Sequence, residues 1–533
     1  MNGATLLAKS AALHPESVAV RHGQEALTYA QLAERAARLG RALLDLGLNA
    51  GDRVALMQRN GLPLMESLYG CLFAGLVVVP INVRLHPREV AFIVSDAGCR
   101  ALLHSADFNV GLAQVESEFP SGLVRVSDVP STGERDYHGM ISRAEPLTGP
   151  VDRRPEDIAW LFYTSGTTGR PKGVMWTHRT IINLAIDYLA DVYPMSPDDV
   201  VLHAAPMSHG SGTVALAAVA RGAKNLILHT PSFDPDAVFE LIEHDRVTNI
   251  AFLAPTQVVK LVDSYQPGKH DLSSLRCLLY GGAPMYLDHL KKALATFGPV
   301  LVQVLGQGES PMTISYLSRQ DHLRLWTDGD ASLGSAGVAR TSVEVRVVDS
   351  DDMPVKAGTS GEIVVRGDIV MAGYWANEDA TSEALRGGWL HTGDIGSLDE
   401  RGYLSVLDRS KEMLITGGNN VYPREVEEVL LTHPAVAECA VIGIPDNYWG
   451  ESVHAIVALR EGVSATEEEL RSYCSMNLAS YKKPRTVEFL QSLPKNAYGK
   501  VLKRELRESH WSGYERRVGG GLVRTDSDQD LHS

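Results

Sequence analysis

A series of short apolar segments, separated by stretches with helical character, constrains the fold of this chain more than any other feature. The segments are 53–57, 77–81, 158–163, 200–205, 225–229, 249–253, 275–280 and 300–305. Buried strands that alternate with helices are typical of an α/β fold whose sheet is largely parallel. Parallel sheets bind ligands in crevices at the carboxyl ends of their strands, so we expect a site at those ends.

The clearest helical segment runs from Thr28 to Leu46. Its apolar residues recur at helical spacing, at Leu32, Ala36, Leu39, Leu43 and Leu46. Thr28 is a typical N-cap residue, and Gly47 is typical of the position just after a helix. The pattern therefore predicts both ends of this helix.

The pattern changes after residue 335, where strand-like segments at 344–350 and 361–367 follow each other without a long helix between them. We expect a smaller β-rich subdomain there. From residue 410 onward the pattern changes again, with helices near 423–431 and 466–477 and strands near 436–443 and 453–459. This layout predicts a small α+β domain of about 100 residues.

A chain of 533 residues exceeds the length at which a single hydrophobic core stops growing. We therefore expect a large N-terminal domain of layered α/β sheets, including the β-rich subdomain, over 1–409. A small α+β C-terminal domain is expected over 410–515. The stretch 516–533 is Gly-rich and then polar, which predicts a disordered tail.

The charge balance limits the classes of partner. Lys and Arg number 50 and Asp and Glu number 65, so the net charge is −15. We therefore expect binding neither to nucleic acid nor to anionic membranes. The sequence shows no run of 18 apolar residues and no signal-peptide layout, which predicts a cytoplasmic protein without a membrane span.

The cysteines point to a reducing compartment. They are scattered and odd in number, and none forms a C-x-x-C pair: Cys71, Cys99, Cys277, Cys439 and Cys474. This pattern argues against a disulfide framework and against a zinc site.

The stretch YTSGTTGRPKGV, residues 163–174, is rich in groups that bind phosphate. Gly166 and Gly169 allow backbone N–H groups to converge on phosphate oxygens. Hydroxyl donors and one mobile cation accompany them: Thr164, Ser165, Thr167, Thr168 and Lys172. A surface turn is the alternative, but the position directly after a buried strand favours a phosphate loop. It is not a Walker A loop, because Gly173 follows the lysine.

Six further motifs follow in order. They are PMSHGSG (206–212), GGAP (281–284), LGQGES (305–310), HTGD (391–394), DRSKEMLITGGNNVYPREVE (408–427) and PKNAYGK (494–500). Each alone is a weak signal, but seven in sequence are specific. Together they resemble the adenylate-forming superfamily of acyl- and aryl-CoA synthetases, peptide-synthetase adenylation domains and luciferases.

The resemblance implies two half-reactions. A carboxylate attacks the α-phosphate of ATP to give acyl-AMP and pyrophosphate, and CoA then takes the acyl group and releases AMP. It also implies that the C-terminal domain is mobile and rotates between the two steps. Lys411 matches the hinge residue, and Gly417 and Gly418 match the tunnel for the pantetheine arm.

The resemblance also assigns the nucleotide site. Thr164 and Glu309 would hold Mg²⁺, for which hard oxygen ligands are suited. Lys500 would bridge the carboxylate and the α-phosphate. The remaining contacts to ATP and AMP would come from the phosphate loop with Lys172, from Gly282, Ala283 and Pro284 beside the adenine, and from Asp394 and Arg409 beside the ribose.

The acyl site is implied less sharply. His209 matches a residue near the acyl carboxylate, although a buried histidine with satisfied hydrogen bonds explains it equally well. The expected acyl pocket comprises Met207, His209, Gly210, Tyr280, Gly306 and Met312. Methionines adapt to varied apolar shapes, which favours a fatty or aryl acid of moderate size.

The chain departs from the family pattern at two positions. Leu305 stands where the family usually has an aromatic residue that stacks on adenine, and Gly308 stands where it usually has threonine. A lost hydrogen bond to a charged group costs about 1.5–3 kcal/mol. Either the affinity for ATP is weaker, or Gln307 or Ser310 compensates.

Several functional alternatives stay open. The motif PMSHGSG lacks the acidic residue with which peptide-synthetase domains select an amino acid, and no carrier domain follows Lys500. A simple carboxylic acid and free CoA are therefore the expected substrates. The alternatives are an acyl-AMP ligase that delivers to a carrier protein, a luciferase-like oxygenase and a non-catalytic nucleotide-binding relative. A homodimer is also left open.

Overall fold

The computed structural model describes residues 1–164, 171–409, 412–416, 419–446, 448–495, 501–511, 514–516 and 522–524. The chain divides into two compact units. The large unit comprises Met1–Pro284, Lys292–Val345 and Val364–Thr392, and the small unit comprises Met285–Lys291, Arg346–Ile363 and Gly393–Ser533. The α/β fold class is confirmed, with a large and a small unit, whereas the predicted boundary at residue 410 stays a prediction.

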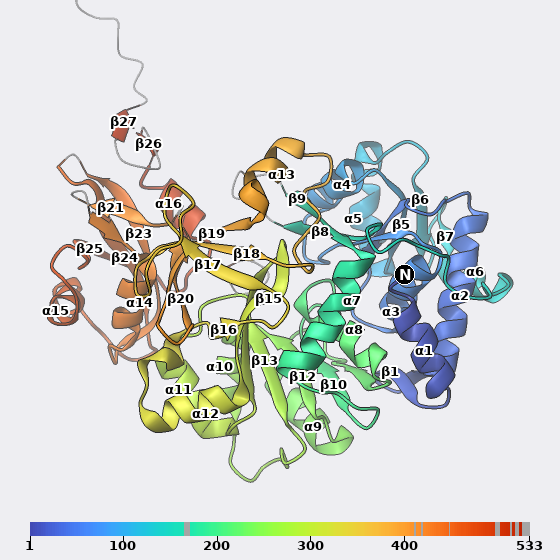
Figure 1. Cartoon of the computed structure of the whole chain (residues 1–533), viewed down its shortest axis with the longest axis horizontal. Helices are drawn as coiled ribbons and strands as arrows, with labels where there is room; N and C mark the ends of the chain where they lie inside the picture. The colour runs from blue at the N-terminus through green and yellow to red at the C-terminus, as the bar shows by residue number, and fades with distance from the viewer. Residues whose placement is uncertain are drawn as a thin grey trace, which may run out of the picture. The chain divides into compact units, whose positions relative to one another are not determined.

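A nine-stranded sheet forms one layer of the large unit (Figure 1). In spatial order its strands are β16 (Val338–Ala339), β15 (Ser310–Leu317), β14 (Leu301–Gln307), β13 (Cys277–Gly281), β12 (Asn249–Leu253), β10 (Val200–His203), β11 (Lys224–Ile227), β1 (Val18–His22) and β2 (Glu25–Thr28). The strands from β14 to β1 pair in parallel, and only the outer pairings are antiparallel. Five of the predicted strands lie in this sheet.

A seven-stranded sheet forms a second layer. Its strands are β7 (Arg135–Asp136), β6 (Val124–Ser127), β5 (Cys99–His104), β3 (Arg53–Met57), β4 (Val77–Pro80), β8 (Ile158–Thr164) and β9 (Lys172–Thr177). All pairings are parallel except that of β8 with β9. Apolar residues of β3, β4, β5 and β8 form one core with α4.

The helices follow the strands in the order that the sequence pattern predicts. They are α1 (Thr5–Leu13), α2 (Tyr29–Asp45), α3 (Leu62–Phe73), α4 (Pro87–Asp96), α5 (Asn109–Ala113), α6 (Tyr137–Arg143), α7 (His178–Asp187), α8 (Gly210–Ala220), α9 (Pro235–Asp245), α10 (Pro255–Ser264), α11 (Leu287–Phe297), α12 (Arg319–Asp328), α13 (Glu378–Ala384), α14 (Pro423–Leu431), α15 (Glu467–Asn477) and α16 (Lys503–Glu508). A π-helical turn, η3 (Tyr188–Val192), continues α7. Figure 1 shows α7 beside α8, and the two helices pack against each other.

Helix α2 shows why local sequence predicts local structure here. The Thr28 hydroxyl accepts a hydrogen bond from the Gln31 N–H, and the Gln31 side chain accepts one from the Thr28 N–H. This reciprocal cap satisfies two N–H groups at the helix start that have no partner within the helix. Leu32, Leu39 and Leu43 are buried along one face. The predicted helix is confirmed.

Four strands form a separate sheet in the order β17 (Glu344–Val348), β18 (Gly361–Arg366), β19 (Leu390–Leu398) and β20 (Leu404–Arg409). The first two confirm the predicted strands at 344–350 and 361–367. Strands β19 and β20 pair antiparallel, with Asp394 opposite Arg409.

The small unit contains a five-stranded sheet. Its strands follow the order β22 (Asn419–Val421), β21 (Leu414–Thr416), β24 (Gly450–Leu459) and β23 (Val436–Asp446). The fifth strand, β25 (Thr486–Phe489), pairs in parallel with β24. Alternate residues of β24 serve two cores, because successive side chains point to opposite faces. Val453, Ala455 and Val457 pack with α14 and α15, whereas Ile456 packs with Leu506 of α16. The α+β character predicted for this region is confirmed.

The C-terminal stretch is described only in part. Strands β26 (Tyr514–Arg516) and β27 (Leu522–Arg524) pair antiparallel. The predicted disorder over 516–533 stays a prediction, and all of that stretch except Arg516 and Leu522–Arg524 lies outside the described residues.

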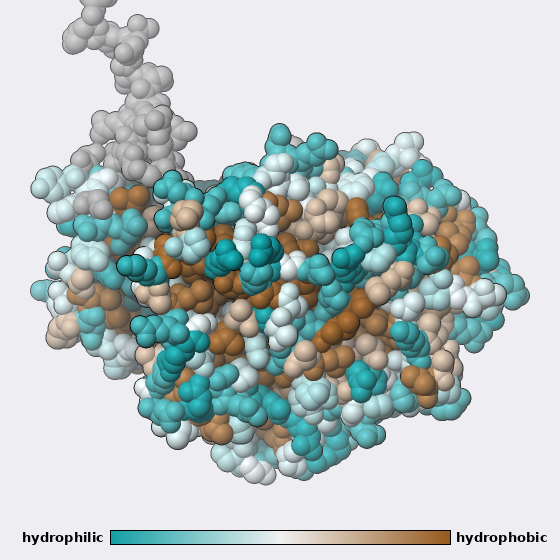
Figure 2. Space-filling view, viewed as in Figure 1, coloured by the Kyte–Doolittle hydropathy of each residue, from teal (hydrophilic) through white to brown (hydrophobic). Residues whose placement is uncertain are grey.

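The surface shown in Figure 2 carries hydrophilic residues over much of its area, with hydrophobic patches between them. No helix within the described part of the chain is both long and apolar enough to cross a bilayer. All five cysteines are buried and free.

Candidate active site

The ends of β8 and β9 place the predicted phosphate loop. Thr164 at the end of β8 lies opposite Lys172 at the start of β9 in the antiparallel register. The two ends of the loop are therefore side by side at the carboxyl end of a buried strand. The predicted residues Ser165, Gly166, Thr167, Thr168 and Gly169 lie outside the described residues.

The turn between β14 and β15 lies directly against Thr164. A Cβ atom added to Gly308 would lie 2.4 Å from Thr164 Cγ2 and 3.0 Å from Phe162 Cδ1. A side chain at position 308 would therefore collide with the end of β8. This close packing explains why glycine stands where the family pattern has threonine. Glu309 is the next residue after this contact.

Glu309 is held from both its side chain and its backbone. The Tyr374 hydroxyl donates a 2.6 Å hydrogen bond to Glu309 Oε1, and the Met371 N–H donates to the Glu309 carbonyl at 2.8 Å. The Lys172 ammonium lies 4.9 Å from the centroid of the Tyr374 ring. One tyrosine therefore contacts both the predicted metal ligand and the predicted phosphate-binding lysine.

Residues 371–375 reach this position because they pair with β9. The Met175 N–H donates to the Gly373 carbonyl at 2.9 Å, and the Trp375 N–H donates to the Gly173 carbonyl at 2.7 Å. Sequence reasoning missed Tyr374. The only signal for it is the aromatic pair that follows Gly373.

Aromatic rings line the region beside Thr164. Phe162 stacks on Trp176 with ring centroids 5.0 Å apart, and it meets His209 edge to face at 5.1 Å. The Trp176 indole N–H donates to the Gly308 carbonyl at 2.8 Å, which fixes the turn. Phe162 and His209 are half-buried. The structure thus places His209 against Phe162, two residues before Thr164 on β8.

His209 is neutral at physiological pH. Burial lowers its pKa to about 4, and its Nδ1 lies 2.9 Å from the Ser208 hydroxyl. A neutral imidazole can donate or accept a hydrogen bond without adding charge. The His209 ring therefore has a hydrogen-bond partner, whereas its predicted place near the acyl carboxylate stays a prediction.

Two glycines allow Phe252 to approach. A Cβ atom on Gly210 would lie 3.0 Å from Phe252 Cδ1, and one on Gly282 would lie 3.4 Å from Phe252 Cζ. Gly282 also has φ +78°, a conformation that favours glycine. The predicted motifs GSG and GGAP therefore meet around one half-buried phenylalanine.

The structure brings the remaining acyl-pocket residues together with one exception. A Cβ atom on Gly306 would lie 2.2 Å from Met312 N, and Met312 Sδ lies 3.9 Å from the Thr213 hydroxyl of α8. A Cβ atom on Gly212 would lie 1.8 Å from the Met207 carbonyl oxygen. These contacts join the turn after β14 to the start of α8.

Tyr280 is the exception: its side chain has partners elsewhere, and its place in the acyl pocket stays a prediction. Its hydroxyl lies 3.0 Å from Gln303 Oε1 and 2.9 Å from His322 Nε2, and the residue is fully buried. Leu279, its neighbour on β13, lines a cavity with Met312. Successive residues of a strand point to opposite faces, so Tyr280 faces away from that cavity.

The same cavity has a polar floor that the sequence did not predict. Arg340 is 3% exposed, and it donates to the Met312 carbonyl at 3.0 Å, the Asp187 carbonyl at 2.8 Å and Asp191 Oδ2 at 2.9 Å. Met312 has φ +60°, which is uncommon for a residue with a side chain. Arg340 therefore fixes both this backbone conformation and the turn η3.

The other predicted residues are described only in part. Asp394 is 8% exposed and lies opposite Arg409 in the pairing of β19 with β20. Lys411, Gly417, Gly418 and Lys500 lie outside the described residues.

Comparisons with known proteins agree with this geometry. Residues 7–375 match the family of AMP-binding enzymes, and residues 425–500 match the AMP-binding enzyme C-terminal domain. A feruloyl-CoA synthase of an Amycolatopsis species is 40% identical over 501 residues, which cover 94% of this chain and 97% of the relative. The long-chain-fatty-acid–CoA ligase FadD13 of Mycobacterium tuberculosis is 35% identical over 491 residues, which cover 91% and 93%.

Solved structures give the same result. ATP-bound MatB from Rhodopseudomonas palustris superposes with a TM-score of 0.86 at 30% identity, and the match covers 96% of this chain and 99% of that one. The family match spans more than half of the chain, and the relatives align over nearly all of it. This chain therefore belongs to the AMP-binding enzyme family.

Proposed function

We propose that this AMP-forming acid–CoA ligase activates an aromatic carboxylic acid of moderate size, of the hydroxycinnamic type. The enzyme uses ATP to convert a carboxylic acid into acyl-AMP with release of pyrophosphate. It then transfers the acyl group to CoA and releases AMP. The proposal concerns which acid is activated and which residues act on it.

The observation that carries the substrate proposal is the set of half-buried rings beside Thr164. Phe162 meets His209 edge to face, and Phe252 lies against Gly210 and Gly282, where an added Cβ atom would meet its ring. Aromatic groups pack favourably edge to face and in offset stacks. A planar acid fits such a wall better than a flexible chain does.

The cavity behind Met312 favours a short acyl group. Its volume is about 10 Å³, which is about the space that one water molecule needs. Arg340 closes it with three hydrogen bonds. A long fatty chain that entered here would have to displace a buried arginine. The relative that is 40% identical acts on an aromatic acid according to its name, and the relative at 35% on a fatty acid.

Charge neutralisation explains why the cluster around Glu309 is needed. A carboxylate and a phosphate at 4 Å repel each other by about 4 kcal/mol at an effective dielectric of 20. Lys172 supplies a positive charge beside Glu309. By its position in the PKNAYGK motif, Lys500 supplies another to the carboxylate and the α-phosphate.

The residues at the end of β8 fit a magnesium ion. Glu309 offers a carboxylate and Thr164 a hydroxyl, and the contact at Gly308 holds the two segments together. These are the hard oxygen ligands that Mg²⁺ prefers. When bound, the ion would neutralise charge on the phosphates. Tyr374 would orient Glu309 through the bond to Oε1.

The other roles follow from the motifs. Neutral His209 would donate a hydrogen bond to the acid's carboxylate, and Asp394 would accept hydrogen bonds from the ribose. Lys411 would act as the hinge that exchanges the two half-reactions. Gly417 and Gly418 would leave room for the pantetheine arm of CoA.

A panel of acids tests the proposal. Hydroxycinnamates, benzoates, and fatty acids of medium and long chain length are compared by AMP release with and without CoA. We expect kcat/KM for a hydroxycinnamate to exceed that for any fatty acid by at least tenfold, and AMP release to require CoA. A preference for fatty acids would reject the aromatic substrate. CoA-independent turnover that needs a carrier protein would instead support an acyl-AMP ligase.

A further inference from the structure

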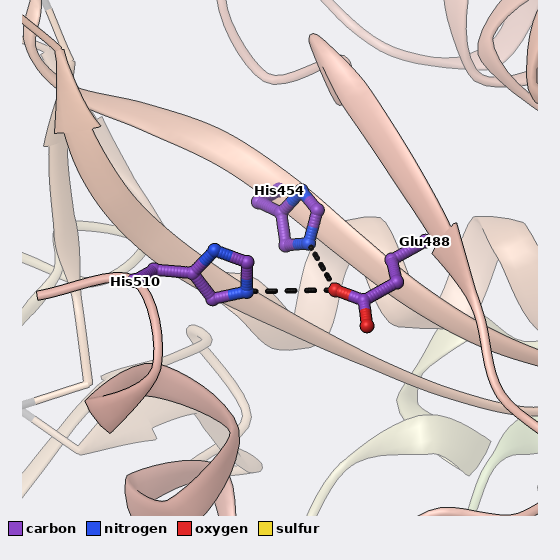
Figure 3. Close-up of side chains that lie close together, drawn as sticks. All are labelled: His454, Glu488 and His510. Carbon is purple, nitrogen blue, oxygen red and sulfur yellow. Dashed lines mark hydrogen bonds and ion pairs between the residues drawn. The ribbon is translucent and has the colours of Figure 1, made fainter.

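Three side chains that the reaction does not use converge in the small unit (Figure 3). His454 lies on β24 and Glu488 on the parallel neighbour β25, whereas His510 follows α16. His454 pairs with Thr486 in the register, so Glu488 lies two residues further along on the same face. The sheet and the segment after α16 thus meet at one point.

The ligand atoms are spaced as they are around a small metal ion. His454 Nε2 lies 3.4 Å from Glu488 Oε2, and His510 Nε2 lies 3.5 Å from the same oxygen. All three ligand atoms lie within 4.8 Å of one another. Tetrahedral zinc with bonds of 2.0–2.2 Å places its ligand atoms about 3.4 Å apart. The ligand nitrogens of His454 and His510 lie within 4.8 Å of each other, so they would have to approach each other slightly to reach that distance.

The histidine on the strand is already oriented for this role. Its Nδ1 lies 2.7 Å from the Thr486 hydroxyl, which leaves Nε2 directed at Glu488. Metal-binding histidines usually have such a partner on the other ring nitrogen. His454 is 5% exposed, whereas Glu488 and His510 are half-buried. A fourth position would therefore be open to water.

We propose that His454, Glu488 and His510 bind one divalent transition-metal ion of the zinc class. Two imidazoles and one carboxylate are a known zinc ligand set, and imidazole suits zinc better than magnesium or calcium. The bound ion would tie the residue after α16 to β24 and β25. The segment between Glu488 and His510 contains Lys500 in the sequence, so the ion would fix both ends of that segment.

This site escaped the sequence analysis for a clear reason. The argument against zinc rested on the cysteines, and the three ligands here are far apart in sequence without any motif spacing. Only the pairing of β24 with β25 and the packing of α16 beneath them bring the ligands together.

The test uses zinc binding by the full chain, not ligase activity. Protein stripped with a chelator is titrated with Zn²⁺ against a chromophoric competitor, and the cobalt-loaded protein is examined for the visible absorption of a tetrahedral Co²⁺ centre. We expect one zinc per chain, a melting temperature that rises with zinc concentration, and at least tenfold weaker binding in His510→Ala and Glu488→Gln. Glu468→Gln and His433→Ala, also in the small unit, serve as controls and should bind like the wild type.

A milder variant keeps the test decisive if a ligand variant fails to fold. Thr486→Val retains all three ligands but removes the bond to His454 Nδ1, so it should weaken zinc binding about tenfold. If the protein takes up no zinc, or if all variants bind it equally, the proposal is wrong and Glu488 only accepts hydrogen bonds from two histidines. Neither result would bear on the proposed ligase function.

Discussion

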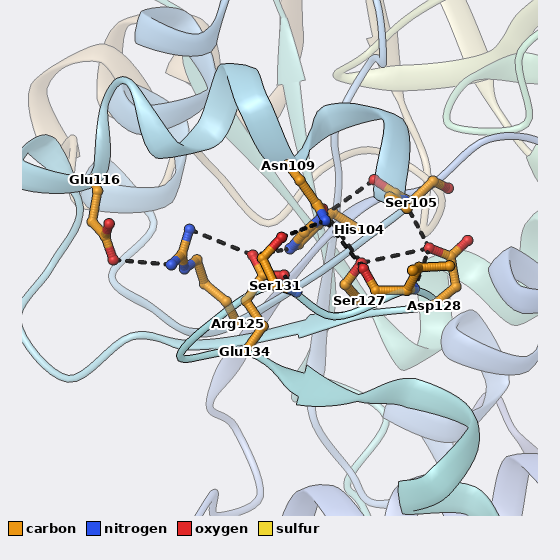
Figure 4. Close-up of polar contacts among 11 residues, drawn as sticks. His104, Ser105, Asn109, Glu116, Arg125, Ser127, Asp128, Ser131 and Glu134 are labelled. Carbon is orange, nitrogen blue, oxygen red and sulfur yellow. Dashed lines mark hydrogen bonds and ion pairs between the residues drawn. The ribbon is translucent and has the colours of Figure 1, made fainter.

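Two regions at the carboxyl ends of the same seven-stranded sheet differ in how their polar groups are used. At the ends of β5 and β6, side chains bond mainly to one another (Figure 4). Glu134 lies 3.2 Å from His104 and 3.5 Å from Arg125, and it also accepts the Ser131 N–H. At the end of β8, Thr164 lies opposite Lys172, and Gly308, the residue before Glu309, packs against Thr164 instead.

The first region is closed. Asn109 bonds Ser131 and the Val129 carbonyl, and Arg125 reaches Glu116 on its outer side at 2.9 Å. The Glu134 side chain is 1% exposed. Polar residues at a strand end therefore do not suffice for a ligand site, because they can be buried against one another, even where His104 Nε2 and Glu134 Oε1 lack a well-aligned hydrogen bond.

In the second region, the described residues leave the polar and charged groups partly exposed. Thr164, Lys172 and Glu309 are half-buried, and Tyr374 contacts Glu309 through only one of its two carboxylate oxygens in this structure. The comparison teaches that a ligand site needs charged groups that neighbouring side chains orient but do not fully surround. Substitutions of Glu309, Glu134 and Tyr374 test this difference, because activity should respond in one region and stability in the other.

The largest effect is expected for Glu309→Gln. Replacing the carboxylate removes a charged oxygen ligand for magnesium but keeps the size of the side chain. We expect pyrophosphate release to fall roughly 10³-fold, or about 4 kcal/mol. Thioester formation from preformed acyl-AMP should change far less, and the urea midpoint should stay within error. If Glu309→Gln released pyrophosphate at the wild-type rate, the assignment of Glu309 to the site would be wrong.

Glu134→Gln should give the opposite result. The substitution leaves the His104 and Arg125 side chains next to a neutral amide in a buried position. Breaking a buried charge pair typically costs 3–5 kcal/mol, and we expect about 3 kcal/mol from the urea midpoint. Activity per folded molecule should not change. Glu145→Gln, at an exposed position, is the matched control. An activity loss like that of Glu309→Gln would end the distinction between the two regions.

The buried histidines predict how stability depends on pH. Burial lowers the pKa of His203 to about 4, and its ring nitrogens lie 2.9 Å from the Ser211 hydroxyl and 3.0 Å from Asn225 Oδ1. The unfolded chain binds a proton near pH 6.5 and the folded chain does not, so stability is full above pH 6.5 and falls as the pH drops toward 4. At pH 5 this amounts to about 2 kcal/mol.

His203→Gln isolates that contribution. Glutamine retains hydrogen-bonding groups but does not titrate, so the variant should lose about 2 kcal/mol less than the wild type between pH 7.5 and pH 5. Urea unfolding at both pH values measures the difference. Equal losses of stability in the two proteins would show that His203 binds a proton as readily in the folded chain as in the unfolded chain.

The sequence predicts the parts of this fold that depend on neighbours along the chain. The α2 cap depends on Thr28 and Gln31, which are three residues apart, and the strands depend on short apolar runs. The candidate site is different. The need for glycine at 308 comes from Thr164 and Phe162, which belong to a distant strand.

The direction of the Tyr280 side chain also depends on distant parts of the chain. The alternation of side chains along a strand shows that Tyr280 and Leu279 face opposite sides of β13. It does not show which side holds the cavity that Met312 lines. That choice is made by His322 and Gln303, which meet the Tyr280 hydroxyl from other elements. Motifs therefore predict a nucleotide site from the sequence, whereas the direction of side chains around β13 required the tertiary structure.

The smallest effect is expected for Tyr374→Phe, which tests how the second region is oriented. The variant loses the 2.6 Å bond to Glu309 Oε1 but keeps the ring that Lys172 approaches. A hydrogen bond to a charged group is worth about 1.5–3 kcal/mol, and water can replace part of it at a half-buried position. We therefore expect pyrophosphate release to fall about tenfold, with the apparent affinity for Mg²⁺ reduced by a similar factor.

Combining Tyr374→Phe with Glu309→Gln decides whether Tyr374 acts through the carboxylate. If it does, the double variant should be about as slow as Glu309→Gln alone, because the group that Tyr374 orients is already gone. If the double variant is slower than Glu309→Gln alone by the factor that Tyr374→Phe shows by itself, Tyr374 acts independently of Glu309, through Lys172. Tyr374→Leu, which also removes the ring, should then show the larger additional loss.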